Sequence, residues 1–95
     1  MYTVAQVTQL ITPLLRKHNV IRAALFGSLV KGTLRPDSDI DVLVEVPETY
    51  SLFDVLRIRV ELEESLKKKV DLVQYKTIKA FARDSILSSQ VSIFS

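Results

Sequence analysis

The sequence predicts a small two-layer α+β fold, in which helices pack on one mixed β-sheet of about four strands. Helix-type and strand-type hydrophobic patterns alternate along the chain in the order αβαβαβαβ, which is typical of helices packed against a sheet. The helix expected between the first two strands is too short for a full crossover connection. We therefore expect a mixed sheet rather than an all-parallel one.

The first expected helix follows Thr3, which has Gln6 at the spacing of a capping box. Pro13 falls inside the helical pattern and removes the backbone hydrogen bond to the carbonyl of Gln9, so we expect a kink or a broken turn there. The apolar face of this helix consists of Val4, Val7, Leu10, Ile11, Leu14 and Leu15. His18, the only histidine, is interpreted as a surface residue at the helix end.

The middle of the chain predicts two strands joined by a short helical turn and a loop. Residues 21–26 form a short apolar run that stops at Gly27, as a buried strand would. Residues 28–38 indicate one or two helical turns and then a loop, because turn-forming residues cluster at the end of this segment. A second strand is expected over residues 39–46, and Pro47 ends it.

The second half begins with the most strongly predicted helix. Ser51 and Asp54 have capping-box spacing, and the segment up to Lys69 is rich in helix-forming residues. The remaining expected elements are a strand over residues 70–75, a helix over residues 78–87 and a short strand over residues 91–94.

Length and composition limit what the protein can be. The chain has 95 residues, of which 47% are hydrophobic, and this is enough for one core. We expect one domain, residues 1–95, with no separate domain for recognising a substrate. The absence of cysteine excludes disulfides and thiolate metal sites. No signal peptide or membrane span is indicated, so we expect a cytoplasmic protein. The net charge is +2 and the two signs are mixed along the chain, which does not favour nucleic acid as a partner.

Two acids at the start of the second strand are the first candidate site. In a strand, Asp39 and Asp41 project from one face, with their Cα atoms about 6.5 to 7 Å apart. Carboxylates held together repel unless a cation neutralises them, and Mg²⁺ and Mn²⁺ prefer such oxygen ligands. Two solvated acids at an exposed strand end are the alternative, because a lone Asp-x-Asp pattern is a weak signal.

A glycine-containing turn strengthens the interpretation of this pair. Gly27 and Ser28 end a strand and begin a helical turn, where backbone N–H groups can hold phosphate oxygens. Lys31 can meet a phosphate as a point charge, and Gly32 lets the chain turn back. Each glycine taken alone is equally compatible with an ordinary turn.

Asp71 is the third candidate acid, because it interrupts an apolar segment that should be a buried strand. An unpaired buried carboxylate is unfavourable. Asp71 therefore either sits at an exposed strand end or faces Asp39 and Asp41 and shares a metal ion with them.

Together these residues resemble a known family. Ala-Leu-Phe-Gly-Ser at residues 24–28, Gly32, Ser-Asp-Ile-Asp-Val-Leu-Val at residues 38–44 and Lys-Val-Asp-Leu-Val at residues 69–73 resemble the minimal nucleotidyltransferases of the DNA polymerase beta-like superfamily. The resemblance covers about residues 4–94. Ten residues separate Ser28 from Asp39, a spacing similar to that of antitoxins paired with HEPN-domain toxins. The family commonly has Ala-Arg-Gly before its loop, where this chain has Val-Lys-Gly at residues 30–32.

The resemblance implies a nucleotidyltransferase fold and a two-metal reaction. Asp39, Asp41 and Asp71 would be the catalytic residues and would bind two Mg²⁺ ions, with Mn²⁺ as a substitute. The nucleotide-binding residues would be Gly27, Ser28, Lys31 and Ser38. The donor would be ATP, and the acceptor a hydroxyl of a HEPN toxin, for which this chain would be the antitoxin in a hetero-oligomer.

Two other functions remain open. The chain could block its partner by contact alone and keep the acids as a relic. A transferase directed at nucleic acid is disfavoured by the nearly neutral charge. Three further features have lesser roles. Residues 67–69 are interpreted as solvated lysines at a helix end, and Arg59 and Glu63 as an ion pair or an interface edge. Residues 91–94 are expected to form an edge strand, which either docks a partner or is only blunted by Ser92 and Ser95.

Overall fold

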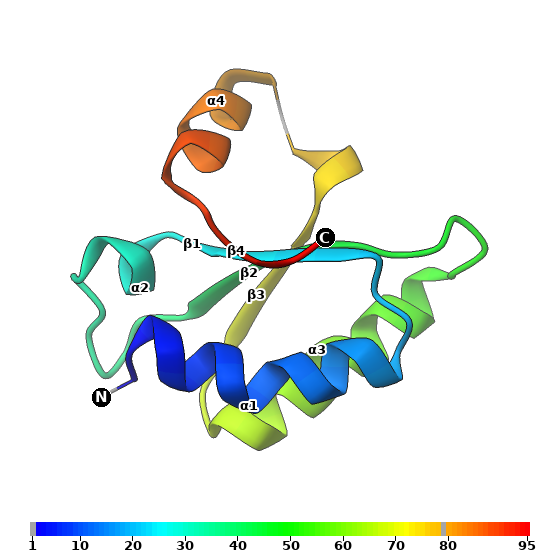
Figure 1. Cartoon of the computed structure of the whole chain (residues 1–95), viewed down its shortest axis with the longest axis horizontal. Helices are drawn as coiled ribbons and strands as arrows, with labels where there is room; N and C mark the ends of the chain where they lie inside the picture. The colour runs from blue at the N-terminus through cyan, green and yellow to red at the C-terminus, as the bar shows by residue number, and fades with distance from the viewer. Residues whose placement is uncertain (1, 79) are drawn as a thin grey trace.

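The computed structural model describes residues 2–78 and 80–95 and has a four-stranded sheet covered by helices (Figure 1). The predicted α+β class with a mixed sheet is confirmed. The elements are, in order, α1 (Val4–Lys17), β1 (Arg22–Phe26), α2 (Ser28–Lys31), β2 (Ile40–Glu45), α3 (Leu52–Leu66), β3 (Val70–Gln74), the 3₁₀ turn η1 (Tyr75–Thr77), α4 (Ala80–Ser89) and β4 (Val91–Phe94).

The strands lie in the order β3-β2-β1-β4. β1 runs antiparallel to both β2 and β4, whereas β2 and β3 are parallel. The connection lengths explain this pattern, because α2 and its loop can only return the chain antiparallel, whereas α3 is long enough for a parallel crossover. β4 is an edge strand, as predicted.

The two faces of the sheet are covered differently. α1 and α3 lie side by side on one face, and α4 lies on the opposite face (Figure 1). Alternate residues of β2 follow this division: Ile40 and Val42 belong to the core under α1 and α3, whereas Leu43 belongs to a smaller cluster on the α4 side. The α4 side therefore carries one helix, Ala80–Ser89, whereas the other face carries the two longer helices α1 and α3 (Figure 1).

Helix α1 confirms its predicted capping box, in which the Oγ1 of Thr3 accepts from the N–H of Gln6 at 3.2 Å. The structure contradicts the broken turn that was one of the two expectations at Pro13, because α1 continues from Val4 to Lys17. Pro13 and Gln9 both lie on the exposed side of the helix. Water can therefore satisfy the carbonyl that proline leaves without a donor.

Helix α3 confirms the capping box of Ser51 and Asp54 but ends at Leu66, three residues before the expected end. Lys67 has a left-handed backbone with φ 56°, which terminates the helix. The last helix begins later than expected, because a 3₁₀ turn precedes it. Residue 79, which the expected helix included, lies outside the described residues.

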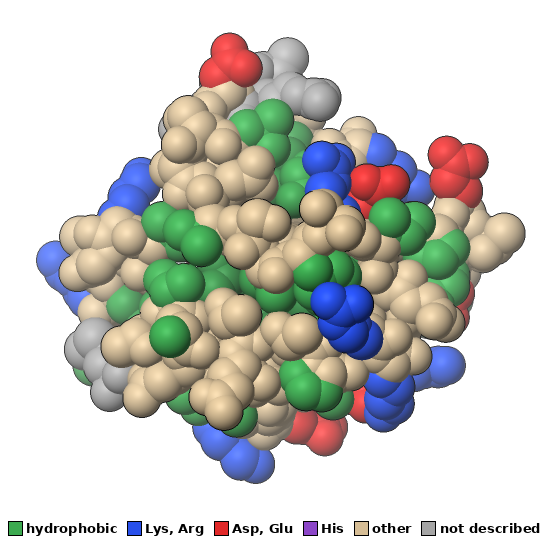
Figure 2. Space-filling view, in the orientation of Figure 1, with side chains coloured by type: hydrophobic (Ala, Val, Ile, Leu, Met, Phe, Trp, Pro, Cys, Tyr) green, Lys and Arg blue, Asp and Glu red, His purple; other side chains and the backbone are tan. Residues whose placement is uncertain are grey.

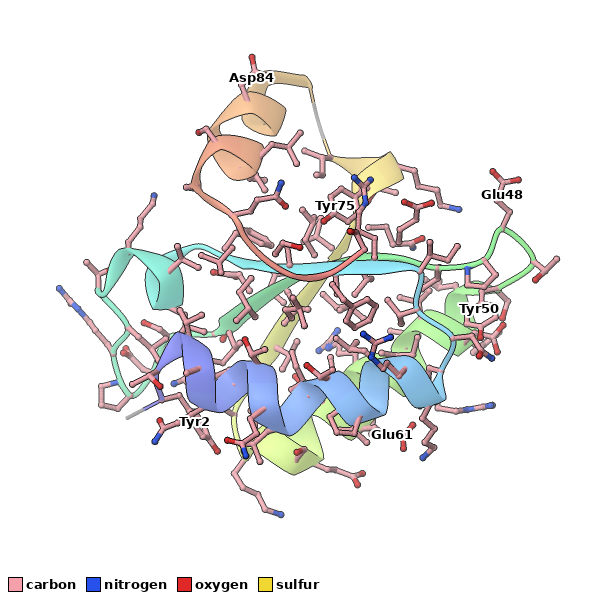
Figure 3. All side chains as sticks on the ribbon, in the orientation of Figure 1. Tyr2, Glu48, Tyr50, Glu61, Tyr75 and Asp84 are labelled. Carbon is pink, nitrogen blue, oxygen red and sulfur yellow. The ribbon has the colours of Figure 1, made fainter. Side chains whose placement is uncertain are left out.

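Polar contacts join the end of α1 to α3 and to the segment before α3. Glu61 binds Lys17 at 2.7 Å and also contacts the ring of His18, and the hydroxyl of Tyr50 donates to the His18 carbonyl at 2.5 Å. Figure 3 shows Glu61 on the lower side of the molecule and Tyr50 at its right-hand edge. His18 is thus a half-buried partner of Glu61 rather than a free surface residue. None of the helices in the described ranges is long and apolar enough to cross a membrane.

Candidate active site

The structure brings two of the three predicted acids to adjacent positions of the sheet. β2 and β3 pair in a parallel register that sets Asp41 beside Asp71. Asp41 shares its face of β2 with Leu43, so both acids lie on the α4 side of the sheet. Asp39 lies directly before the first residue of β2. Asp41 is half-buried, whereas Asp39 and Asp71 are exposed.

The electrostatics of Asp41 reflect these neighbours. Burial, followed by the negative charges of Asp71 and Asp39, raises the pKa of Asp41 from 3.8 to about 6. A hydrogen bond from the Ser28 backbone N–H opposes this rise in pKa, whereas a side-chain hydrogen bond with Asp71 adds to it. Two carboxyl groups can share a hydrogen bond only when one of them holds a proton. The three acids therefore form one interacting group whose full ionisation is unfavourable.

Gly27 lies directly against this group. A Cβ atom added at Gly27 would lie 1.9 Å from Oδ2 of Asp41 and 2.8 Å from its Cγ, so only glycine leaves space for this carboxylate. The backbone of Gly27 has φ 74° and ψ −148°, a conformation open almost only to glycine. The turn predicted to hold phosphate and the predicted metal ligands are thus in contact.

This contact changes one expectation. The Ser28 N–H was expected to be bare and ready for phosphate, but it donates to Asp41. This part of the turn therefore orients the carboxylate. Lys31 is exposed at the last position of α2, and Gly32 after it has φ 74° with nothing within 4 Å of an added Cβ.

Ser38 closes a turn immediately before Asp39. Its Oγ accepts from the N–H of Arg35 at 3.1 Å, and its own N–H donates to the Arg35 carbonyl at 3.0 Å. The backbone N–H of Ile40 then donates to the carbonyl of Lys69 at 2.9 Å and begins the pairing with β3. In this arrangement Ser38 shapes the approach to Asp39.

The three carboxylates are the kind of ligand that a divalent cation such as Mg²⁺ prefers. Asp39, Asp41 and Asp71 supply only carboxylate oxygens, and an ion such as Mg²⁺ would relieve the repulsion that raises the pKa of Asp41. Within residues 2–78 and 80–95, however, no three acidic or histidine side chains already converge as a metal-ligand group. Binding would therefore require some rearrangement that brings all three carboxylates onto one point.

One contributor was missed by the sequence analysis. Lys68 was interpreted as a solvated lysine, but its Nζ donates to the carbonyls of Arg35 at 3.1 Å and Pro36 at 2.7 Å. These partners lie 33 and 32 residues away in sequence, so no local signal reveals the contact. Lys68 therefore joins the loop before Asp39 to the turn before β3.

Comparison with known proteins identifies the family. The family described as polymerase beta, nucleotidyltransferase matches residues 9–95. The chain belongs to this nucleotidyltransferase family. Over 88 residues it is 42% identical to a protein of Methanocaldococcus jannaschii that has the provisional name protein adenylyltransferase, with 93% of this chain and 95% of the relative covered. It is 30% identical to protein adenylyltransferase MntA of Thermococcus cleftensis, with 98% of each chain covered.

Solved structures agree with this assignment to the nucleotidyltransferases. A structure described as a minimal nucleotidyltransferase matches 88% of this chain and 86% of its own, with 31% identity and a TM-score of 0.78. A chain from a complex of a tri-AMPylated HEPN toxin of Shewanella oneidensis with an MNT antitoxin matches with 21% identity and a TM-score of 0.73, covering 94% of this chain and 70% of its own. At that identity the second likeness concerns the fold alone.

Proposed function

We propose that this nucleotidyltransferase moves AMP from ATP to a hydroxyl of a partner protein, with Mg²⁺ as cofactor, and acts as antitoxin to a HEPN toxin. The observation that carries the proposal is the contact of the crowded Asp41 carboxylate with the side-chain-free Gly27 turn. Phosphate transfer needs cation-binding acids and a close backbone approach at one point, and these features meet here.

Each residue has a stated role in this proposal. Asp39, Asp41 and Asp71 hold two divalent ions, and Lys31 offsets phosphate charge from α2. Bound ions would neutralise the triphosphate and lower the pKa of the attacking hydroxyl. The acceptor oxygen forms a bond to the α-phosphorus, the bond to the bridging α–β oxygen breaks, and pyrophosphate leaves while the hydroxyl proton passes to solvent.

The names of the relatives support the choice of AMP and of a protein acceptor, because both are named protein adenylyltransferases. The toxin–antitoxin complex supports the choice of partner through its fold. Nucleic acid as a target gains no support from the small net charge of +2. On the face seen in Figure 2, Lys and Arg side chains are dispersed rather than gathered in one patch.

The test is transfer of label from α-³²P-ATP and Mg²⁺ to the product of the neighbouring gene. Label from α-³²P-ATP but not from γ-³²P-ATP is expected, because AMP retains the α-phosphate. Transfer from both would contradict AMP as the group moved, and transfer from neither would contradict the proposed activity.

Inhibition by contact alone is the second candidate. Four large apolar side chains on α3 are exposed and offer a surface that a protein could cover: Leu52, Phe53, Leu56 and Val60. An Asp39→Ala variant separates the candidates. Inhibition of the toxin by contact would persist in this variant, whereas inhibition by AMP transfer would be lost.

A further inference from the structure

The position of Asp39 depends on the loop before it, which Leu34 anchors in the core. Asp39 follows the segment between α2 and β2, in which residues 35–37 are exposed. Its C-terminal side is fixed by pairing of β2 with β3, which begins when Ile40 donates to the Lys69 carbonyl. Its N-terminal side is fixed by the turn that Arg35 and Ser38 form.

Lys68 connects this turn to the remainder of the protein. Its half-buried side chain comes from the turn between α3 and β3, which also leads to Asp71, and donates to two carbonyls of the loop. The Arg35 carbonyl accepts from both the Lys68 ammonium group and the Ser38 N–H. One oxygen therefore closes the turn before Asp39 and also binds Lys68. Hydrogen bonds from an ammonium group are stronger than neutral ones.

We infer that Lys68 is a positioning residue that holds Asp39 near Asp41 and Asp71, so that the three acids can bind a divalent ion together. This inference rests on the proposed function. Lys68 lies one residue beyond the left-handed position that ends α3. One short turn therefore carries both the hydrogen bonds to the loop before Asp39 and the start of the strand that contains Asp71.

Lys67 provides a matched control. It lies in the same turn and carries the same charge, but it is exposed, and no hydrogen bond or ion pair joins its side chain to the other described residues. Lys67→Met and Lys68→Met remove the same charge from nearly the same place. Only the second variant removes the tie to the loop.

The test measures Mn²⁺ binding to the nucleotide-free protein by calorimetry, with thermal unfolding in parallel. We expect Lys68→Met to weaken Mn²⁺ binding by up to about tenfold, the lower end of the loss when a direct outer contact to a metal ligand is removed, because Lys68 holds the loop before Asp39 rather than Asp39 itself. Lys67→Met should match wild type, and Lys68→Arg should recover most of the affinity because it keeps the charged donors. Lys68→Gln, which is shorter and uncharged, should behave like Lys68→Met and serves as a second variant if methionine impairs folding.

The outcomes distinguish this inference from the proposed function. Wild-type Mn²⁺ affinity in folded Lys68→Met or Lys68→Gln would overturn the role of Lys68 while leaving the proposed function intact. Equal losses in the Lys67 and Lys68 variants would also overturn it, because charge alone would then be responsible. Failure of the wild-type protein to bind Mn²⁺ any better than Asp39→Ala would contradict the proposed site itself.

Discussion

Replacing Gly27 with alanine tests whether the turn and the acids form one site. The added methyl group would lie 1.9 Å from Oδ2 of Asp41, so the carboxylate must move away. The backbone conformation of Gly27 would add strain of about 1–3 kcal/mol for any other residue. We therefore expect lower stability together with loss of Mn²⁺ and nucleotide binding.

Gly32→Ala is the control, because Gly32 also has φ 74°, with ψ 19° in the left-handed region, but has nothing within 4 Å of an added Cβ. It should lower stability by about 1 kcal/mol, which corresponds to a fall in Tm of about 4–8 °C for a domain of this size. Its binding of Mn²⁺ and nucleotide should be unchanged once the protein is folded. The pair thus separates the general effect of an alanine at a positive φ from displacement of Asp41.

The assays are calorimetric titration with Mn²⁺ and with a non-hydrolysable ATP analogue, at a temperature where both variants are folded. Wild-type affinity in Gly27→Ala would refute the reasoning, because Asp41 would then not be needed in its observed place. Equal losses of affinity in the two glycine variants would refute it as well, since strain would explain both.

Three further predictions concern charged residues of the site. Folding raises the pKa of Asp41 from 3.8 to about 6, so protonated Asp41 contributes stability to the metal-free protein below about pH 4, and this contribution is lost as the pH rises through 6. Asp41→Asn should flatten this part of the Tm-against-pH curve, and an unchanged slope would contradict the prediction. Asp39→Ala should abolish label transfer without lowering the metal-free Tm, and transfer at the wild-type rate would exclude Asp39 as a ligand. Lys31→Glu should weaken nucleotide binding about tenfold or more by calorimetry while Lys31→Arg preserves it; equal affinity of all three proteins would remove Lys31 from the site.

The fold could largely be predicted from local signals. The capping boxes at Thr3 and Ser51 and the alternation of apolar residues act within a few positions of the chain, so the sequence identifies them directly. The same holds for the spacing of Asp39 and Asp41. A broken turn at Pro13 did not follow, because the effect of proline depends on which side of α1 faces solvent, and that is decided by packing.

The remainder of the candidate site was decided by tertiary structure. The sequence left Asp71 with two possible environments, and the parallel register of β2 and β3 set it beside Asp41. The contact between Gly27 and Asp41 and the tie from Lys68 to Pro36 join residues that are far apart in the chain. Such contacts depend on how strands pair and turns meet, whereas helix and strand periods follow from backbone geometry alone. The sequence by itself therefore determined which residues could do the chemistry, and the register of the sheet decided which of them meet.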